Sequence, residues 1–231
     1  MKKIISILVL FLALAYTVCA SEIFSNNLND LAEITSAGGV VEGSASFVQG
    51  MDGDAVYLPG TSAVRFSNID FSDSGVVEFW FKPDFDIKDL PRFTTKGLLE
   101  VGNFPGPNSM GVWIYRSEYG PVLVFEIKDK NGNYRQVWSR ISSFNPKKWH
   151  HAAIEWNCNN NKAKKNYARI LLDGKKGSKK KNMCADGINL DNKQIRIGDT
   201  GYYSGDTATF DKLKAYNNWK DVKQVKKDYK K

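Results

Sequence analysis

Two adjacent histidines, His150 and His151, are the residues of this chain best suited to acid–base chemistry, because imidazole titrates near neutral pH. Neither has a carboxylate partner at an evident sequence spacing. Glu126 and Asp129 come nearest to the paired carboxyl groups of a glycosidase, but strand alternation would put them on opposite faces. The sequence also lacks a Gly-x-Ser-x-Gly elbow, a phosphate loop and a His-Glu-x-x-His motif. We therefore expect the histidines to be structural and the protein not to be an enzyme.

A different chemistry, stacking on sugar rings, needs exposed aromatic side chains. Two predicted strands set aliphatic side chains on one face and aromatic side chains with polar companions on the other. The aromatic row consists of Trp113, Tyr115, Tyr134 and Trp138. If the aliphatic face meets a second sheet, the row faces solvent and suits a glycan or a protein interface. The alternative is that loops cover both faces and these rings belong to the core.

The charged residues are divided unevenly along the chain. Residues 21–146 carry 10 Lys+Arg and 16 Asp+Glu, a net −6, whereas residues 147–231 carry 21 and 9, a net +12. We expect charged loop tips at 161–165 and 175–181, the second forming a basic contact surface. Its lysines are Lys175, Lys176, Lys179, Lys180 and Lys181. The alternative is that these lysines belong to solvated loops of a lysine-rich chain and bind no partner. Nucleic acid is not an expected partner, because no reading motif accompanies the lysines.

The N-terminus has the pattern of a secretory signal peptide. Lys2 and Lys3 precede an apolar run over 4–15, and small residues follow up to Ala20. The run is too short to span a bilayer, and no later stretch could span one. We expect cleavage after Ala20 and export to the periplasm or the cell surface. A lipid anchor on Cys19 is the alternative.

Two cysteines, Cys158 and Cys184, stay in the predicted mature chain. An even pair in an exported protein is a candidate disulfide, which would enclose a long hairpin and contribute roughly 3 kcal/mol. Two free thiols are the alternative. Zinc is not expected, because the cysteines and histidines lack the paired spacing of zinc sites.

The elements that would position these residues are almost all strands. Hydrophobic residues make up 42% and aromatic residues 13% of the 231 residues, which excludes a disordered chain. Short β-branched and aromatic runs recur between Gly, Asn, Asp and Pro. They lie at 55–58, 63–67, 75–82, 97–101, 110–116, 122–127, 134–140, 149–156, 167–173, 194–197 and 207–216. This spacing predicts an all-β fold, a two-sheet antiparallel jelly-roll sandwich. We expect one domain over 21–218, followed by a basic tail or short helix over 219–231.

Several segments resemble, in order, the laminin-G-like or concanavalin A-like jelly-roll family. The most specific is 145–156, with its Lys-Trp-His-His strand, followed by 168–175, which ends in Asp-Gly. Segments 52–60, 75–83 and 209–217 resemble further strands of the family. The resemblance implies the fold strongly and the function weakly, because this architecture hosts lectins, adhesion modules, enzymes and structural proteins.

The same resemblance implies a possible structural Ca²⁺. Many family members hold this ion with loop oxygens, and Asp52, Asp54 and Asp211 occupy matching regions. The family commonly has Glu after the last aspartate, whereas this chain has Lys212. The alternative is that the aspartates accept backbone N–H groups in turns.

Two functions follow from these patterns. The first is an exported, non-enzymatic structural protein that assembles with a protein partner such as a filament, sheath or envelope component. The second is a carbohydrate-binding module that uses the aromatic row. The sequence favours the protein partner slightly, because a sugar-binding lectin usually joins other modules or shows a clear ligand loop, and neither is visible.

Overall fold

The computed structural model describes six stretches of the chain. They are residues 20–141, 144–145, 147–159, 166–202, 208–218 and 222–230. The predicted signal peptide, apart from Ala20, and the predicted tip at 161–165 lie outside the described residues.

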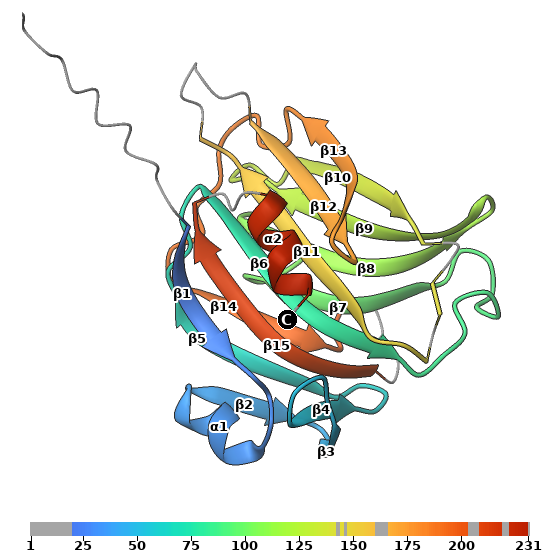
Figure 1. Cartoon of the computed structure of the whole chain (residues 1–231). Coiled ribbons are helices and arrows are strands. Elements are labelled where there is room, and N and C mark those ends of the chain that lie inside the picture. Colours follow the sequence, from blue (N-terminus) through green and yellow to red (C-terminus); the bar gives the residue numbers. More distant parts are fainter. Residues whose placement is uncertain are drawn as a thin grey trace, which may run out of the picture.

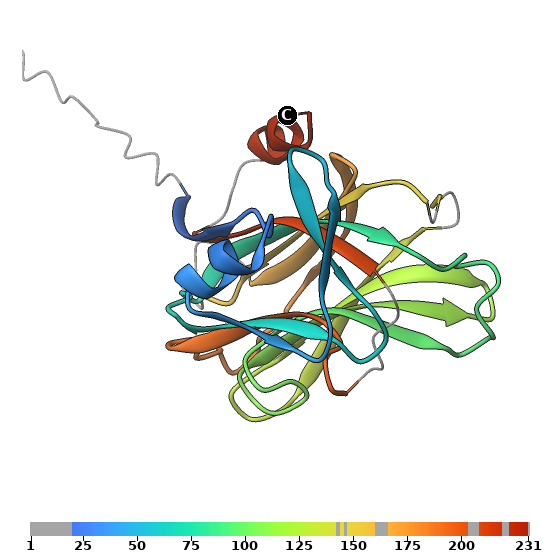
Figure 2. The ribbon, with the colours of Figure 1, turned by 90° about the horizontal axis from the view of Figure 1, so that it is seen from below.

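Two antiparallel sheets pack face to face, and Figure 2 shows the two layers. Sheet A has eight strands: β1 (Ser21–Asn26), β3 (Ser46–Gln49), β4 (Asp54–Leu58), β6 (Ser74–Pro83), β11 (His150–Asn157), β12 (Tyr167–Leu172), β13 (Lys175–Lys181) and β15 (Ala208–Asn217). Sheet B has seven: β2 (Gly39–Glu42), β5 (Ala63–Ile69), β7 (Thr95–Val101), β8 (Ser109–Ser117), β9 (Gly120–Lys128), β10 (Tyr134–Arg140) and β14 (Lys193–Gly198). The predicted two-sheet sandwich is confirmed.

The order of strands puts β13 at one edge of sheet A and β10 at one edge of sheet B. Sheet A runs β13-β12-β11-β6-β15-β4-β3, with β1 also paired to β15, and sheet B runs β10-β9-β8-β7-β14-β5-β2. Both edges lie on the same side of the molecule (Figure 1).

Strand alternation builds the core between the sheets. Val112 and Ile114 of β8 and Val137 of β10 are buried in the main cluster, as their parity predicts. Their neighbours on β8, Trp113 and Tyr115, point to the opposite face and belong to a separate apolar cluster.

Four strands and one helix are absent from the sequence-based prediction. They are β1, β2, β3, β13 and α1 (Leu31–Ser36). The prediction of a charged tip at 175–181 is wrong, because this segment is strand β13. Its backbone pairs with the edge of β12, and this pairing needs no apolar side chains. Charged residues also suit an exposed edge strand, because they oppose pairing with another chain.

A second helix, α2 (Val222–Tyr229), lies in the predicted tail and packs on the outer face of sheet A (Figures 1 and 2). Val225 is buried in a small apolar cluster there, and the Tyr229 ring stacks on Trp80 with 5.5 Å between centroids. The short helix is therefore observed within the predicted tail. Neither helix of the described residues is long and apolar enough to cross a membrane.

A disulfide joins Cys158, just after β11, to Cys184, just beyond β13. The two Cα atoms are 5.3 Å apart, and both cysteines are buried. The predicted disulfide is confirmed.

Candidate functional site

One row of residues crosses the outer face of sheet B from strand to strand. In order along the row they are Arg65, Arg196, Glu100, Gly111, Glu126 and Gln136. Directly paired residues of neighbouring strands point to the same face of a sheet. Sequence reasoning missed this row because each member comes from a different strand.

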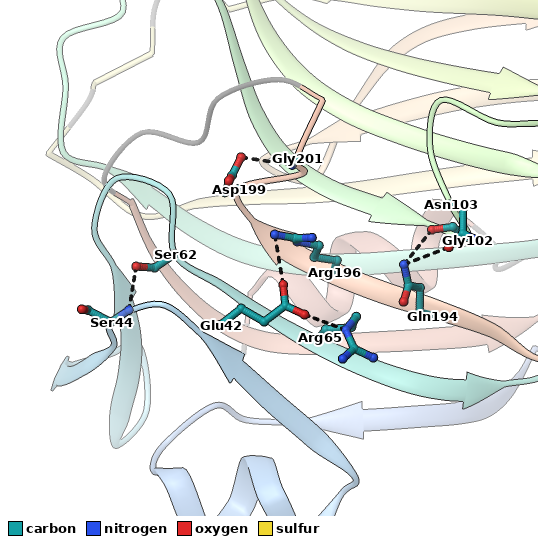
Figure 3. A network of polar contacts seen from close by, with 10 residues as sticks. All are labelled: Glu42, Ser44, Ser62, Arg65, Gly102, Asn103, Gln194, Arg196, Asp199 and Gly201. Carbon is teal, nitrogen blue, oxygen red and sulfur yellow. Dashed lines mark hydrogen bonds and ion pairs between the residues drawn. The ribbon is translucent and has the colours of Figure 1, made fainter.

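At the arginine end of the row, one carboxylate of the chain bridges both guanidinium groups. Glu42 accepts from Nε of Arg65 at 2.8 Å and lies 3.1 Å from the guanidinium of Arg196. Figure 3 shows Glu42 between the two arginines. Nearby, Gln194 donates to the carbonyl of Gly102 at 3.2 Å and so ties the loop after β7 to the sheet (Figure 3). This end of the row is a structural network.

The middle of the row holds two buried carboxyl groups. Glu100 is 3% exposed, and burial raises its pKa from 4.5 to about 8 although Arg196 opposes the shift. Glu126 is 4% exposed, and burial also raises its pKa. Gly111 separates them, and ring atoms of Phe104 and Trp113 lie 3.0–3.1 Å from where its Cβ would be. A sugar ring therefore has no room between the two carboxyl groups.

The prediction that Trp113 faces solvent is wrong. Its side chain is only 4% exposed, because Phe104 folds over it with 5.6 Å between ring centroids. Phe104 belongs to the loop after β7, and Tyr202 packs edge-on against it at 5.8 Å. A loop thus covers one member of the predicted aromatic row and leaves the other three accessible.

The accessible members, Tyr115, Tyr134 and Trp138, form what we call the aromatic platform. Trp138 is 46% and Tyr134 62% exposed, while Tyr115 is partly buried. Tyr115 and Trp138 meet edge to face with 6.2 Å between centroids. The ammonium group of Lys128 lies 6.0 Å from the Tyr134 ring centroid. The platform therefore presents partly fixed aromatic rings at the β10 edge of sheet B.

Gln136 holds the platform to the sheet. Its Nε2 donates to Oε2 of Glu126 at 2.6 Å, and its Oε1 accepts the indole N–H of Trp138 at 2.9 Å. A buried carboxyl group thus orients an exposed indole through a single amide.

A groove of about 770 Å³ lies between β10 and β13. It is lined by residues 132–138 and by Ser178, Lys179 and Lys180. Next to it the two sheet edges almost touch, because a Cβ on Gly177 would lie 2.8 Å from Oγ of Ser139. The groove brings Tyr134 and Trp138 of the predicted aromatic row beside Lys179 and Lys180 of the predicted basic surface.

The predicted basic surface does not form a single face. Lys179 pairs with Arg169, and its ammonium lies 3.6 Å from the Tyr167 ring centroid on the outer side of sheet A. Burial, with Arg169 nearby, lowers the pKa of Lys179. Lys180 pairs instead with the buried Ala168 and so leaves β13 on the core side. All five lysines of β13 are exposed, including Lys175, Lys176 and Lys181.

Both histidines have a carboxylate neighbour, contrary to the expectation from sequence spacing. His150 Nδ1 lies 2.9 Å from Oδ2 of Asp173, and His151 Nε2 lies 3.7 Å from Oε2 of Glu78. The partners come from the turn after β12 and from β6, so spacing along the chain could not reveal them. Both imidazole rings are buried, as a structural role requires.

The three aspartates of the implied calcium site do not fit such a site. Asp211 is completely buried and accepts the N–H of Met51 at 2.7 Å, while Asp52 and Asp54 are exposed. The Lys212 ammonium lies 3.7 Å from the Asp52 carboxylate, where a cation would otherwise be attracted. Within the described ranges, no three Asp, Glu, His or Cys side chains converge on a point that could hold a metal ion.

No protein-family model matches this chain, and neither does any curated protein. Similar solved structures do exist, and several of them are described as binding domains. One similar structure is domain 4 of AbnA, a GH43 extracellular arabinanase from Geobacillus stearothermophilus, which was solved in complex with arabinotriose. Its sequence is 17% identical to this one, and the TM-score is 0.63, with 90% of this chain and 98% of that chain covered. The botulinum neurotoxin serotype D ligand binding domain, solved with N-acetylneuraminic acid, is 14% identical with a TM-score of 0.68 over 91% of this chain.

The binding domain of Paraclostridial Mosquitocidal Protein 1 is 18% identical, with a TM-score of 0.63 over 90% of this chain. This chain spans about half the length of the serotype D domain and of the Paraclostridial domain, 50% and 51% respectively. At such identities the likeness establishes the β-sandwich fold, while the laminin-G-like family stays a prediction.

Proposed function

We propose that this protein is an exported carbohydrate-binding module that holds its ligand on the aromatic platform. The observation that carries the proposal is the state of Trp138, whose ring is exposed but fixed by Gln136 and Tyr115. Sugar stacking needs an accessible aromatic face, and a face already held in position loses less freedom on binding.

Three further observations support the proposal. The similar domains of the arabinanase and the serotype D toxin were solved with arabinotriose and N-acetylneuraminic acid, which are both carbohydrates. A non-catalytic role agrees with the closed space between Glu100 and Glu126. Export agrees with the signal-peptide pattern and with the disulfide, because disulfides persist in oxidising compartments.

The test is a glycan array followed by isothermal titration of the best glycan, with arabino-oligosaccharides included. We expect Trp138→Ala to weaken binding by about tenfold, or roughly 1.4 kcal/mol, because it removes the stacking surface. The matched control is Tyr119→Ala, which removes an exposed ring in the turn between β8 and β9, outside the platform. The proposal fails if no glycan binds, or if both variants bind as the wild type does.

A protein partner in the envelope is the second candidate function. Its support is the division of charge along the chain together with the lysine-rich edge strand β13. Affinity purification from the native envelope, with and without glycosidase treatment, separates the two candidates. A stoichiometric protein partner that survives the treatment favours assembly, whereas loss of capture after treatment favours glycan binding.

A further inference from the structure

The groove between β10 and β13 has a cationic group on each wall. Arg135 pairs with Ile127 and Lys180 pairs with Ala168, and both partners belong to the main core. Directly paired side chains share a face, so Arg135 and Lys180 leave their strands on the core side, where the two sheet edges face each other. Both are exposed, and neither forms an ion pair within the described part of the chain.

None of the described residues that line the groove is an aspartate or a glutamate, and two nearby carboxylates, of Asp129 and Asp186, lie only at its turn end. Asn133, at the turn end of the groove, donates its amide N–H groups toward Asp129 and Asp186, at 3.5 and 3.1 Å. Asp129 also accepts two backbone N–H groups of its own turn and is buried. The groove therefore carries two positive charges without a matching acid on its walls.

The groove meets the aromatic platform at the β10 edge. Tyr134 and Trp138 leave this edge strand on its outer face and Arg135 leaves it on the core side, and all three line the groove. The five β10 residues that line it extend roughly 17 Å, which is long enough for an oligosaccharide. Its volume of about 770 Å³ is within the range of small-ligand sites.

We infer that this groove binds an acidic oligosaccharide, one that carries uronic acid or another carboxylated sugar. The sugar chain crosses the β10 edge, so that rings stack on Tyr134 and Trp138 on the outer face, and the carboxylate of a neighbouring sugar unit lies between Arg135 and Lys180 on the core side. A guanidinium can hold a carboxylate through two parallel hydrogen bonds, and lysine adds a point charge. This inference rests on the proposed function and names its class of ligand.

The experiment is isothermal titration of the full chain with an oligogalacturonate and with its neutral methyl ester, at about 0.05 M and about 0.5 M salt. We expect the acid to bind about tenfold more tightly than the ester at low salt, and the difference to shrink at high salt. The double variant Arg135→Gln/Lys180→Gln should lose the preference for the acid and keep the affinity for the ester. The control, Lys226→Gln/Lys227→Gln on α2, removes the same charge from the outer side of sheet A and should change nothing.

If the acid and the ester bind equally, and the groove variant changes neither affinity, the preference for an acidic ligand is wrong. The lysines of β13 then only protect a sheet edge, and the proposed function stands. If neither glycan binds and a broad array also fails, the proposed function fails as well. If an oligoglutamate of equal charge binds as tightly as the oligogalacturonate, the groove recognises an acidic peptide and the inference is wrong.

Discussion

Trp138 donates its indole N–H to Oε1 of Gln136, two residues earlier on the same face of β10, at 2.9 Å. The other end of that amide donates to the buried Glu126 in the next strand at 2.6 Å. An exposed aromatic ring is therefore linked to a buried carboxyl group by a single side chain. Free side chains on a sheet surface lose rotamer freedom when a ligand orders them, and here part of that ordering is complete before binding.

Replacing Gln136 with leucine should lower the free energy of unfolding by about 1–3 kcal/mol, because Glu126 would then lack its hydrogen-bond donor. It should also weaken glycan binding severalfold, since Trp138 loses its anchor. Urea denaturation measures the first effect and titration the second. Arg140→Leu, on the same exposed face of β10, is the control and should change stability by less than about 0.5 kcal/mol.

The stability of the protein should depend on the protonation of Glu100. Its pKa is about 8 in the folded protein and 4.5 for an ordinary glutamate, so the folded state keeps a proton that the unfolded state releases. Stability should therefore fall as pH rises from about 4.5 to about 8, and then level off. The pKa of Glu126 is also raised, so the pH dependence of the wild type alone would combine both groups. The test therefore compares Glu100→Gln, which removes only the titration of Glu100, with the wild type. The Tm advantage of the variant should grow with pH, and a constant difference would contradict this explanation.

Gly177 should tolerate no side chain. An added Cβ would lie 2.8 Å from Oγ of Ser139 in β10 and 2.8 Å from the backbone carbonyl oxygen of Ile170 in β12, so alanine must push β13 away from β12 and crowd β10. We expect Gly177→Ala to lower the free energy of unfolding by about 1–3 kcal/mol in chemical denaturation. Adding Ser139→Ala should recover only part of the loss, because the backbone contact with Ile170 stays. Full stability of the single variant would contradict both close approaches of Gly177, to Ser139 and to Ile170.

Reduction of the disulfide should destabilise the protein by about 3 kcal/mol. Cys158 and Cys184 are 26 residues apart, and their bond restricts the unfolded chain. Thermal unfolding of a Cys158→Ser/Cys184→Ser variant should show a lower Tm than that of the oxidised wild type. A reducing agent should lower the Tm of the wild type to the same value and leave the variant unchanged. An equal Tm for oxidised and reduced protein would contradict the prediction.

The alternation of apolar and polar residues along the sequence predicted the sandwich. Side chains alternate between the two faces of a strand regardless of which strand lies beside it. Parity alone placed Val112 in the core and its neighbour Trp113 on the other face, and the structure agrees. The same pattern could not show β13, because its side chains are almost all charged and its pairing with β12 uses only backbone groups. Nor could it show that Phe104 covers Trp113, since the cover depends on how the β7–β8 loop folds back over the strand that follows it.

The amino-acid sequence by itself determined the two-sheet class, the paired cysteines and which residues share a strand face, because these depend on neighbours along the chain. Tertiary structure decided which faces are open and which residues from distant strands meet. Glu100 and Glu126 lie in one row through strand register, and Arg135 and Lys180 line one groove through the meeting of two sheet edges. Burial and pairing between remote segments are properties of the packed molecule, and the candidate site is built from them.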